Sequence, residues 1–279
     1  MKLPNSDDDP RQHEIGLLYR RYLAEFGEDD SDIWVATYSK SGTTWMQLIL
    51  YQLTTDGEMS FDHLFDVSPW LYYSALRRVA PTRTSAPRIL KTHDPYRRFA
   101  SGRKGRYVLV MRDGKDVCVS WYHHRRDFRG YEGSFDEHFE EFLHGREYNW
   151  FLHLRDWLEN VSRLPVLRVK YEELSREFDA TVDRVSAFCR LEVDAQTRAR
   201  TRERCSFAAM KQHERRLGPR ADHFVGQASP PFSVKAEGQF IRRGQVGDGL
   251  RVLSERQLRD YRRRFDEVLG GYDVVAEYR

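Results

Sequence analysis

Short apolar runs alternate with amphipathic segments along most of the chain. Four runs, partly β-branched, predict buried strands at residues 33–37 (IWVAT), 88–92 (RILKT), 107–111 (YVLVM) and 165–169 (PVLRV). Apolar residues spaced three or four positions apart predict helices over 13–26, 44–53, 116–122, 135–160 (one helix or two), 172–191 and 255–269. Strands that alternate with helices favour an α/β fold, with a central parallel sheet flanked by helices on both faces.

The domain organisation is simple. Residues 1–12 are polar and acidic, and we expect them to be disordered, while residues 13–279 show no repeat or boundary and predict a single domain. Residues 54–87 are less regular, and a basic stretch containing Gly and Pro follows residue 205. Long connections of this kind inside a compact domain are often functional loops.

Composition narrows the classes of function. The chain has 279 residues, 40% of them hydrophobic and 32% charged, with a formal net charge of +3, which fits a local anion site better than a nucleic-acid track. Its first residues do not resemble a signal peptide, and no apolar run approaches the roughly 20 residues that span a bilayer. The cysteines (Cys118, Cys189 and Cys205) are odd in number and have no metal-like or redox-like spacing, so we expect a reduced, cytoplasmic protein.

The segment 38–45, YSKSGTTW, joins a predicted strand to a predicted helix and has the features of an anion site. The first N–H groups of a helix lack internal partners, Gly42 allows close approach of the backbone, and Lys40 adds a positive charge. The spacing is not that of a triphosphate loop, because Lys40 precedes the glycine. The same residues also fit a plain strand-to-helix turn with a threonine cap, and Trp45 fits a core position.

A second candidate anion site follows the strand at 107–111. Arg112 comes directly after this strand, where ligands of open α/β sheets bind, and Ser120 lies further along the next helix. The alternative is structural: Arg112 would pair with Asp113 or Asp116, and Ser120 would cap or pack.

Five segments together resemble the cytosolic-type sulfotransferases, which use 3′-phosphoadenosine 5′-phosphosulfate (PAPS). YSKSGTTW resembles the family's 5′-phosphosulfate loop, usually YPKSGTTW, and RDGKDVCVS (residues 112–120) resembles its 3′-phosphate segment, R-x-x-x-D-x-x-x-S. KTHDP (91–95) is similar to KTHLP, CSFAAMK (205–211) to TSFxxMK, and FIRRG (240–244) to F-x-R-K-G. The segments occur in the family's order and span residues 38–244.

The resemblance implies a fold with a P-loop-like strand, loop and helix, and a transfer of the sulfuryl group from PAPS to an acceptor hydroxyl or amine. The residues it assigns to the 5′-phosphosulfate are Lys40, Ser41, Gly42, Thr43 and Thr44. Those assigned to the adenosine and its 3′-phosphate are Trp45, which would stack on the adenine, Arg112, Ser120, Tyr171, Phe207, Arg242, Arg243 and Gly244.

It also implies a mechanism of in-line transfer without a metal. His93 would be the general base that takes the hydroxyl proton. Without the KTH context, the alternative would be favoured: a histidine at the end of a strand with no catalytic role. Lys40 would stabilise charge on the leaving oxygen of adenosine 3′,5′-bisphosphate, and Lys91 would add charge near the transferring group. His123 and His124 are adjacent on a helix and point about 100° apart, so they are not expected to share a metal ion.

The sequence departs from the family pattern at several positions. Ser39 stands where proline is usual, Cys205 where threonine is common, and Arg243 where lysine is usual. Residues 247–255 (GDGLRVLSE) do not match the K-x-x-x-T-V-x-x-x-E segment through which many members dimerise, so the family dimer is not assumed.

The motifs do not identify the small-molecule acceptor. Its pocket would lie among residues 61–87, 93–100, 121–139 and 213–240. An aromatic or apolar acceptor would suit the rings there, each of which could equally be a packing residue: Phe65, Trp70, Tyr72, Tyr73, Tyr96, Tyr122 and Phe139. An anionic acceptor would suit a basic group that could also be a solvated face: Arg77, Arg78, Arg97 and Arg98. An ATP-dependent small-molecule kinase and a non-catalytic nucleotide-binding protein are the alternative functions.

Overall fold

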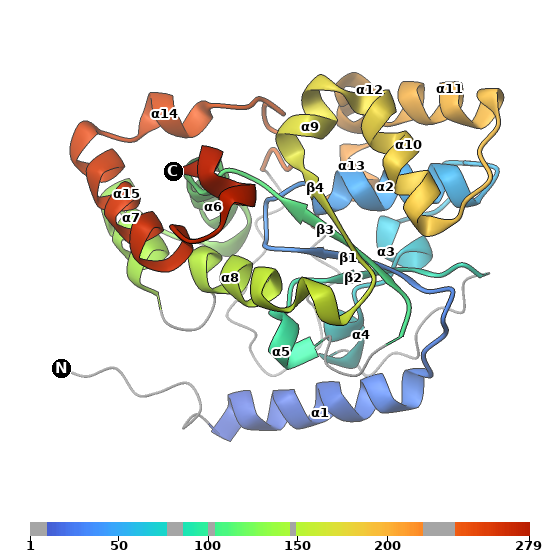
Figure 1. Ribbon diagram of the computed structural model, residues 1–279, viewed down its shortest axis with the longest axis horizontal. Helices are drawn as coiled ribbons and strands as arrows, with labels where there is room; N and C mark the ends of the chain where they lie inside the picture. The colour runs from blue at the N-terminus through green and yellow to red at the C-terminus, as the bar shows by residue number, and fades with distance from the viewer. Residues whose placement is uncertain (1–9, 77–85, 100–103, 146–148, 220–237) are drawn as a thin grey trace.

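Parallel strands form a sheet in the centre of the protein, between two layers of helices (Figure 1). The computed structural model describes residues 10–76, 86–99, 104–145, 149–219 and 238–279. In this part of the chain the strand order is β2-β1-β3-β4. The strands are β1 (Ile33–Thr37), β2 (Ile89–Thr92), β3 (Arg106–Met111) and β4 (Val166–Lys170). All of the pairings are parallel, which confirms the predicted α/β fold and places each predicted strand within one residue of its observed bounds.

The two faces of the sheet bury alternate residues of the central strands. On one face Trp34 and Leu109 pack with helices from both ends of the chain, and on the other Val35 and Val108 pack against α2 (Thr43–Thr54) and its neighbours. Strand β1 is buried at every position, which is why it reads as a continuous apolar run rather than an alternating one.

The helices cover both faces and surround the carboxyl edge of the sheet (Figure 1). Besides α2, the longer ones are α1 (Pro10–Phe26), α6 (Gly114–Arg129), α7 (Phe135–His144), α8 (Trp150–Asn160), α10 (Phe178–Cys189), α11 (Ala195–Arg204) and α15 (Glu255–Leu269). The shorter ones are α3 (Leu64–Val67), α4 (Leu71–Leu76), α5 (Tyr96–Phe99), α9 (Tyr171–Arg176), α12 (Phe207–Gln212), α13 (Glu214–Leu217) and α14 (Asp248–Val252), with 3₁₀ turns at Val161–Arg163 and Asp273–Tyr278. None of the helices in the described ranges is long and apolar enough to cross a membrane.

Several element boundaries differ from the prediction. Helix α1 begins at Pro10, so residues 10–12 are helical rather than disordered, while residues 1–9 lie outside the described part of the chain. The helix expected over 172–191 is two helices, because the backbone leaves the helical region at Glu177 (φ −132°, ψ 52°). The single helix allowed for 135–160 is two, α7 and α8, each started by a side-chain cap.

The strand register brings three loops together. Ala36 of β1 lies beside Thr92 of β2, and Thr37 lies beside Val110 of β3. The residues that follow these three strands therefore leave the sheet at the same edge, next to one another. Ligands of open α/β sheets bind at this carboxyl edge, and the candidate site is built there.

Candidate functional site

One cavity at the carboxyl edge collects almost all of the predicted site residues. Its volume is about 520 Å³, and its walls come from the segments after β1, β2 and β3, from α6, and from the chain around residues 205–218 and 240–248. The predicted residues that line it are Lys40, Gly42, Thr43, Thr44, Trp45, Lys91, His93, Arg112, Ser120, Tyr171, Phe207, Arg242, Arg243 and Gly244. Ser41 is the exception, because its side chain is buried beneath the loop and Ser39 lines the cavity instead.

The loop between β1 and α2 is held in a conformation that opens toward the cavity. Lys40 and Gly42 both have positive φ, 68° and 100°, and the amide of Ser41 donates to the Tyr38 carbonyl at 3.3 Å. A side chain at position 42 would be strained, and its Cβ would also lie 2.9 Å from the Tyr171 ring. The glycine thus allows both the turn and the close packing that place the first amides of α2 at the cavity.

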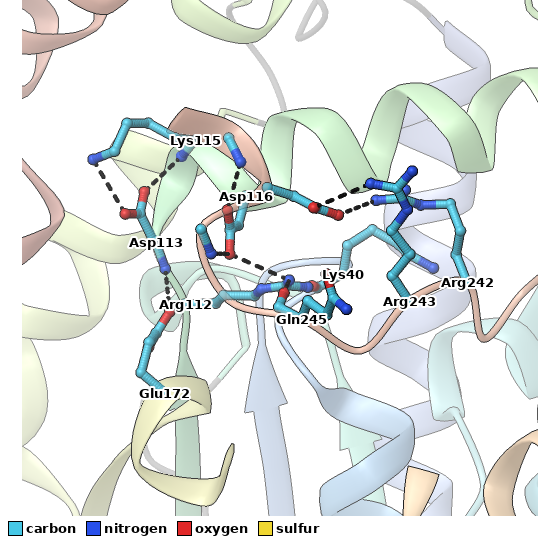
Figure 2. A network of polar contacts seen from close by, with 12 residues as sticks. Lys40, Arg112, Asp113, Lys115, Asp116, Glu172, Arg242, Arg243 and Gln245 are labelled. Atoms are coloured by element: carbon cyan, nitrogen blue, oxygen red, sulfur yellow. Dashed lines mark hydrogen bonds and ion pairs between the residues drawn. The ribbon is translucent and has the colours of Figure 1, made fainter. Parts of the chain in front are cut away.

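Arg112 is the link between the β1 loop and the C-terminal loop (Figure 2). Its guanidinium donates to the carbonyl of Lys40 at 3.2 Å and to that of Gln245 at 3.0 Å, and it lies 4.2 Å from the Tyr171 ring centre. It also pairs with Asp116 at 3.4 Å, so the ion pair weighed in the sequence is present. The arginine is braced by its neighbours and still lines the cavity, so this ion pair is compatible with the predicted role of Arg112 in binding an anion.

Two aspartates, Asp116 and Asp248, hold the C-terminal loop in place, a role that the sequence did not predict for either. The Asp116 carboxylate accepts from the amides of Gly247 at 2.9 Å and Gly249 at 2.7 Å. Asp248, which is buried, pairs with Arg242 at 2.8 Å and more loosely with Arg243 at 3.4 Å. The pair of arginines is therefore positioned at the cavity wall by a carboxylate from its own loop.

An aromatic cluster forms the wall beside the β1 loop. Trp45 meets Tyr171 edge to face at 5.5 Å and stacks with Phe178 at 6.1 Å, and its indole N–H donates to the carbonyl of Cys205 at 2.9 Å. The contribution of Cys205 is thus a backbone one, and its thiol is fully buried. Phe207 is 46% exposed and lines the cavity at the same wall. We call this wall, together with Lys40 to Thr44, Arg112, Ser120 and residues 242–248, the anion half of the cavity.

His93 lies beside the end of β1 because of the register between β1 and β2. Its Nδ1 is 2.9 Å from the carbonyl oxygen of Thr37 and 3.1 Å from the Thr37 hydroxyl, which in turn is 2.6 Å from the hydroxyl of Thr43. A carbonyl oxygen can only accept, so Nδ1 carries the proton and the basic lone pair of the ring is on Nε2. Thr37 was not identified from the sequence, where it read simply as the last residue of a buried strand.

Burial and neighbouring cations shift the ionisation of the basic groups. Burial, followed by the positive charge of Arg112, lowers the pKa of Lys40 to about 7. Burial, followed by the positive charge of Lys40, lowers the pKa of Lys91 to about 7. Burial, followed by the charge of Lys91, holds the pKa of His93 well below its usual value. The histidine is therefore neutral at neutral pH, as a proton acceptor must be.

The remainder of the cavity, which we call the aromatic half, is lined by rings with basic groups among them. These residues are Phe65, Trp70, Lys91, His93, Trp121, His124, Phe128, Arg129 and Phe240. Trp70 is placed by a parallel β-bridge to Lys91, in which the Lys91 amide donates to the Pro69 carbonyl at 3.0 Å. The centre of the Trp70 ring lies 5.3 Å from that of the His93 ring. The two halves meet at Lys40, whose Nζ is 4.4 Å from the ring centre of Phe240.

Most of the rings proposed for an acceptor pocket are packing residues. Phe65 and Trp70 line the cavity, whereas Tyr73, Tyr96 and Phe139 are buried, and Tyr72 and Tyr122 are absent from its walls. Of the arginines proposed there, Arg97 pairs with Asp156 and Glu159. Of the other three, Arg77 and Arg78 lie outside the described residues, and so does the side chain of Arg98. Trp121, Phe128 and Phe240 line the cavity and lie in ranges predicted for the pocket, 121–139 and 213–240, but they were not singled out among the rings.

No group of three or more His, Cys, Asp or Glu side chains that could hold a metal occurs among the residues whose positions are described. His124 lines the aromatic half of the cavity, and His123 is not part of its walls.

Comparison with known proteins gives a consistent family assignment. A family model described as "Sulfotransferase domain" matches residues 30–273. The chain is 28% identical over 267 residues to an amine sulfotransferase of Oryctolagus cuniculus (90% of this chain, 85% of the relative), and 27% identical over 279 residues to sulfotransferase 1B1 of Mus musculus (94% and 90%). One similar solved structure is mouse sulfotransferase SULT7A1 complexed with PAP; its TM-score is 0.69 at 22% identity, and the match covers 93% of this chain and 92% of that one. Another is a retinol dehydratase in complex with androsterone and inactive cofactor PAP; its TM-score is 0.67 at 19% identity, and the match covers 91% of this chain and 87% of that one.

Proposed function

The chain belongs to the sulfotransferase family, whose co-substrate is PAPS, and we propose that it transfers the sulfuryl group of PAPS to a hydroxyl group of a small, apolar or aromatic acceptor. The observation that carries the proposal is the convergence of Lys40, His93 and Arg112 on one cavity, each from the carboxyl end of a different neighbouring strand. A kinase loop would supply neither the Arg112 segment nor a neutral histidine at this place.

The anion half fits the nucleotide of PAPS. The open amides at the start of α2 suit the 5′-phosphosulfate, with Lys40 beside them, and Thr43 and Thr44 add hydroxyl groups. Arg112, Ser120 and the Arg242–Arg243 pair suit the 3′-phosphate, which distinguishes PAPS from ATP. The ring of Trp45, flanked by Phe178 and with Phe207 at the same wall, suits the adenine.

The positions of the basic groups support the following reaction. The acceptor oxygen attacks sulfur, and the bond between sulfur and the bridging oxygen of the 5′-phosphate breaks, releasing adenosine 3′,5′-bisphosphate. His93 takes the proton of the acceptor hydroxyl at Nε2, the atom that its contact with Thr37 leaves unprotonated. Lys40 stabilises the negative charge that develops on the bridging oxygen, and Lys91 adds positive charge near the sulfuryl group.

The lowered pKa values of the two lysines suit this cycle. In the free protein Lys40 and Lys91 have pKa values of about 7, so each is only partly charged at neutral pH. A bound phosphosulfate is anionic and favours their protonated forms. Binding of PAPS therefore brings protons to the site and charges the lysines at the time when the leaving group needs them.

The three cysteines are free thiols and buried, which supports a reducing compartment, and we place the enzyme in the cytoplasm.

A transfer assay tests the proposed function. Radiolabelled PAPS is incubated with the protein, a chelator and a set of phenols, alcohols, amines and sugars, and both labelled acceptor and adenosine 3′,5′-bisphosphate are measured. We expect the two products in equal amounts. Transfer of phosphate from ATP with magnesium, without any sulfation, would make the protein a kinase, and binding of PAPS without transfer to any acceptor would make it a non-catalytic nucleotide-binding protein.

A further inference from the structure

A buried carboxylate follows His93 directly in the sequence. The carboxylate of Asp94 accepts hydrogen bonds from the Thr92 hydroxyl at 3.0 Å and from the Tyr19 hydroxyl at 3.1 Å. The family pattern KTHLP has a leucine at this position, where the present chain reads KTHDP. Sulfuryl transfer by His93 and the two lysines gives this carboxylate no direct task, although a buried carboxylate is costly unless its neighbours hold it.

The hydrogen bonds of Asp94 close a short turn around His93. The Asp94 amide donates to the hydroxyl oxygen of Thr92 at 3.1 Å, and the same hydroxyl donates to the Asp94 carboxylate. The residues on either side of His93 are thus bonded to each other, and Thr92 is itself fixed in β2 beside Ala36 of β1. Pro95 follows and restricts the backbone of Asp94. The main chain of His93 is therefore held on both sides.

Helix α1 reaches this turn from a distant part of the chain. Tyr19 is buried, and its hydroxyl bonds to a carboxylate 75 residues away in the sequence. The ring of Tyr19 meets that of Tyr72 in α4 edge to face at 5.2 Å, which fixes the direction of the hydroxyl. Removing one partner of a buried hydrogen bond leaves the other unsatisfied, so the contact couples the position of α1 to the turn that carries His93.

Helix α8 holds the main chain of the same turn. His153 and Trp157 lie on one face of α8, four residues apart, and both are buried. The indole N–H of Trp157 donates to the Asp94 carbonyl at 3.1 Å, and the ring of His153 forms hydrogen bonds with the backbone of Asp94 and of His93. Asp94 is thus fixed through its side chain by α1 and through its backbone by α8.

We propose that Asp94, held by Tyr19 of α1 and by α8, is a positioning residue that aims Nε2 of His93 at the acceptor hydroxyl. The proposal rests on the proposed function, since it assumes that His93 is the general base. Asp94 is not among the described residues that line the cavity, so it acts through His93. A base must lie within hydrogen-bond reach of the proton it takes, so a displaced main chain slows transfer without weakening PAPS.

Rates of sulfuryl transfer to phenol test the proposal. Asp94→Leu should lower kcat about tenfold and Tyr19→Phe about threefold, with the KM for PAPS and the affinity for adenosine 3′,5′-bisphosphate within about twofold. Asp94→Asn should stay within about threefold of the unchanged protein, because its amide oxygen still accepts hydrogen bonds. The double variant of Tyr19→Phe and Asp94→Leu should be no slower than Asp94→Leu alone, because the two changes remove one contact.

Tyr22→Phe is the matched control on the same helix. The Tyr22 hydroxyl forms a hydrogen bond with Ser74 of α4, so this variant also loses a contact between α1 and the rest of the protein. Chemical unfolding should show similar losses of stability in Tyr22→Phe and Tyr19→Phe, whereas kcat should fall in Tyr19→Phe alone. An equal fall of kcat in both variants would show that α1 acts through stability and would overturn the proposal.

A more acidic acceptor separates the aim of a base from a general disturbance of the site. Pentafluorophenol is largely ionised at about pH 7.5 and needs no base, whereas phenol keeps its proton there. The loss of rate in Asp94→Leu should therefore shrink from about tenfold with phenol to within about twofold with pentafluorophenol. An equal loss with both phenols, or an unchanged kcat with phenol, would overturn the proposal.

A measurement on the free protein separates this proposal from the proposed function. NMR of protein labelled with ¹⁵N-histidine reports the state of each ring nitrogen, and His93→Ala identifies the signals of His93. We expect a single tautomer, protonated at Nδ1, in the unchanged protein and in Tyr22→Phe, and a mixture in Asp94→Leu. Unchanged His93 signals in Asp94→Leu would overturn the proposal. If these signals respond while the unchanged protein neither binds the bisphosphate nor sulfates either phenol, Asp94 still positions His93 and the proposed function is what fails.

Discussion

The two halves of the cavity are built in different ways. The anion half rests on continuous segments that leave adjacent strands, and much of it is backbone: the amides of the β1 loop and the carbonyls of Lys40 and Gln245 that hold Arg112. The aromatic half is made of side chains from four separate parts of the chain, near residues 65–70, 91–93, 121–129 and 240. A site for one fixed co-substrate can be specified locally, whereas a site for a variable acceptor is assembled at a distance. Because the two halves are built differently, changes in them should have separable effects.

The largest expected effect separates chemistry from nucleotide binding. His93→Ala should reduce sulfuryl transfer by about a thousandfold, the range attributed to a general base, while affinity for adenosine 3′,5′-bisphosphate stays within about twofold. Steady-state rates and calorimetry measure the two quantities. The matched control is His144→Ala, an exposed histidine far along the chain in α7. A large loss of bisphosphate affinity in His93→Ala would instead make His93 a nucleotide-binding residue.

The reciprocal change acts on the anion half. Arg112→Ala should weaken adenosine 3′,5′-bisphosphate by about a hundredfold, through the loss of charge-assisted hydrogen bonds, and adenosine 5′-phosphosulfate much less. Because Arg112 also holds two carbonyls, Arg112→Lys is the matched variant that keeps the charge and loses that bracing. Equal losses for the two nucleotides in Arg112→Ala would remove Arg112 from the 3′-phosphate site.

The pH dependence of binding tests where the two halves meet. The pKa values of Lys40 and Lys91 are lowered to about 7, so both lysines are charged below pH 7 and lose their protons above it. Affinity for the bisphosphate should therefore be greatest near pH 6.5. If one of these lysines must be charged for binding, the affinity should fall about fivefold between pH 7 and pH 8, because the charged fraction of that lysine falls by this factor. Calorimetry in buffers of different ionisation enthalpy should show proton uptake at pH 8. Constant affinity from pH 7 to pH 9 would contradict the lowered pKa values.

The smallest expected effect concerns the contact that orients the base. Thr37→Val removes the hydroxyl between His93 and Thr43 but keeps the Thr37 carbonyl, so kcat should fall only about threefold, with the KM for PAPS nearly unchanged. Thr37→Ser should restore the rate. A change confined to KM, or no rescue by serine, would show that Thr37 acts on packing rather than on His93.

The strands and the anion half were predictable because their signals are local. A buried parallel strand is apolar throughout, as in residues 33–37, and each anion loop follows such a strand directly. The short segments Tyr38–Trp45 and Arg112–Ser120 therefore contain the parts of that half that follow β1 and β3, whereas the segments around 205–207 and 242–248 reach it from elsewhere. The break at Glu177 and the first turn of α1 were missed, because helix boundaries depend on backbone geometry that periodicity does not report.

The aromatic half was predicted poorly because rings of cores and rings of pockets have the same spacing. Tyr96 and Phe139 are buried, while Phe128 and Phe240 line the cavity, and no local pattern distinguishes the two pairs. Thr37 and Asp248 were missed for another reason. Their roles come from contacts with residues distant in the sequence or from the folding of a loop onto α6, which only the register and the packing reveal.

A crystal structure with adenosine 3′,5′-bisphosphate and a bound phenol would test the central claim most directly. The account predicts the 3′-phosphate on Arg112 and Ser120, the 5′-phosphate at the amides of Gly42 to Thr44 beside Lys40, and the phenol oxygen about 3 Å from Nε2 of His93. A phenol bound away from His93, or a 3′-phosphate bound away from Arg112, would contradict it.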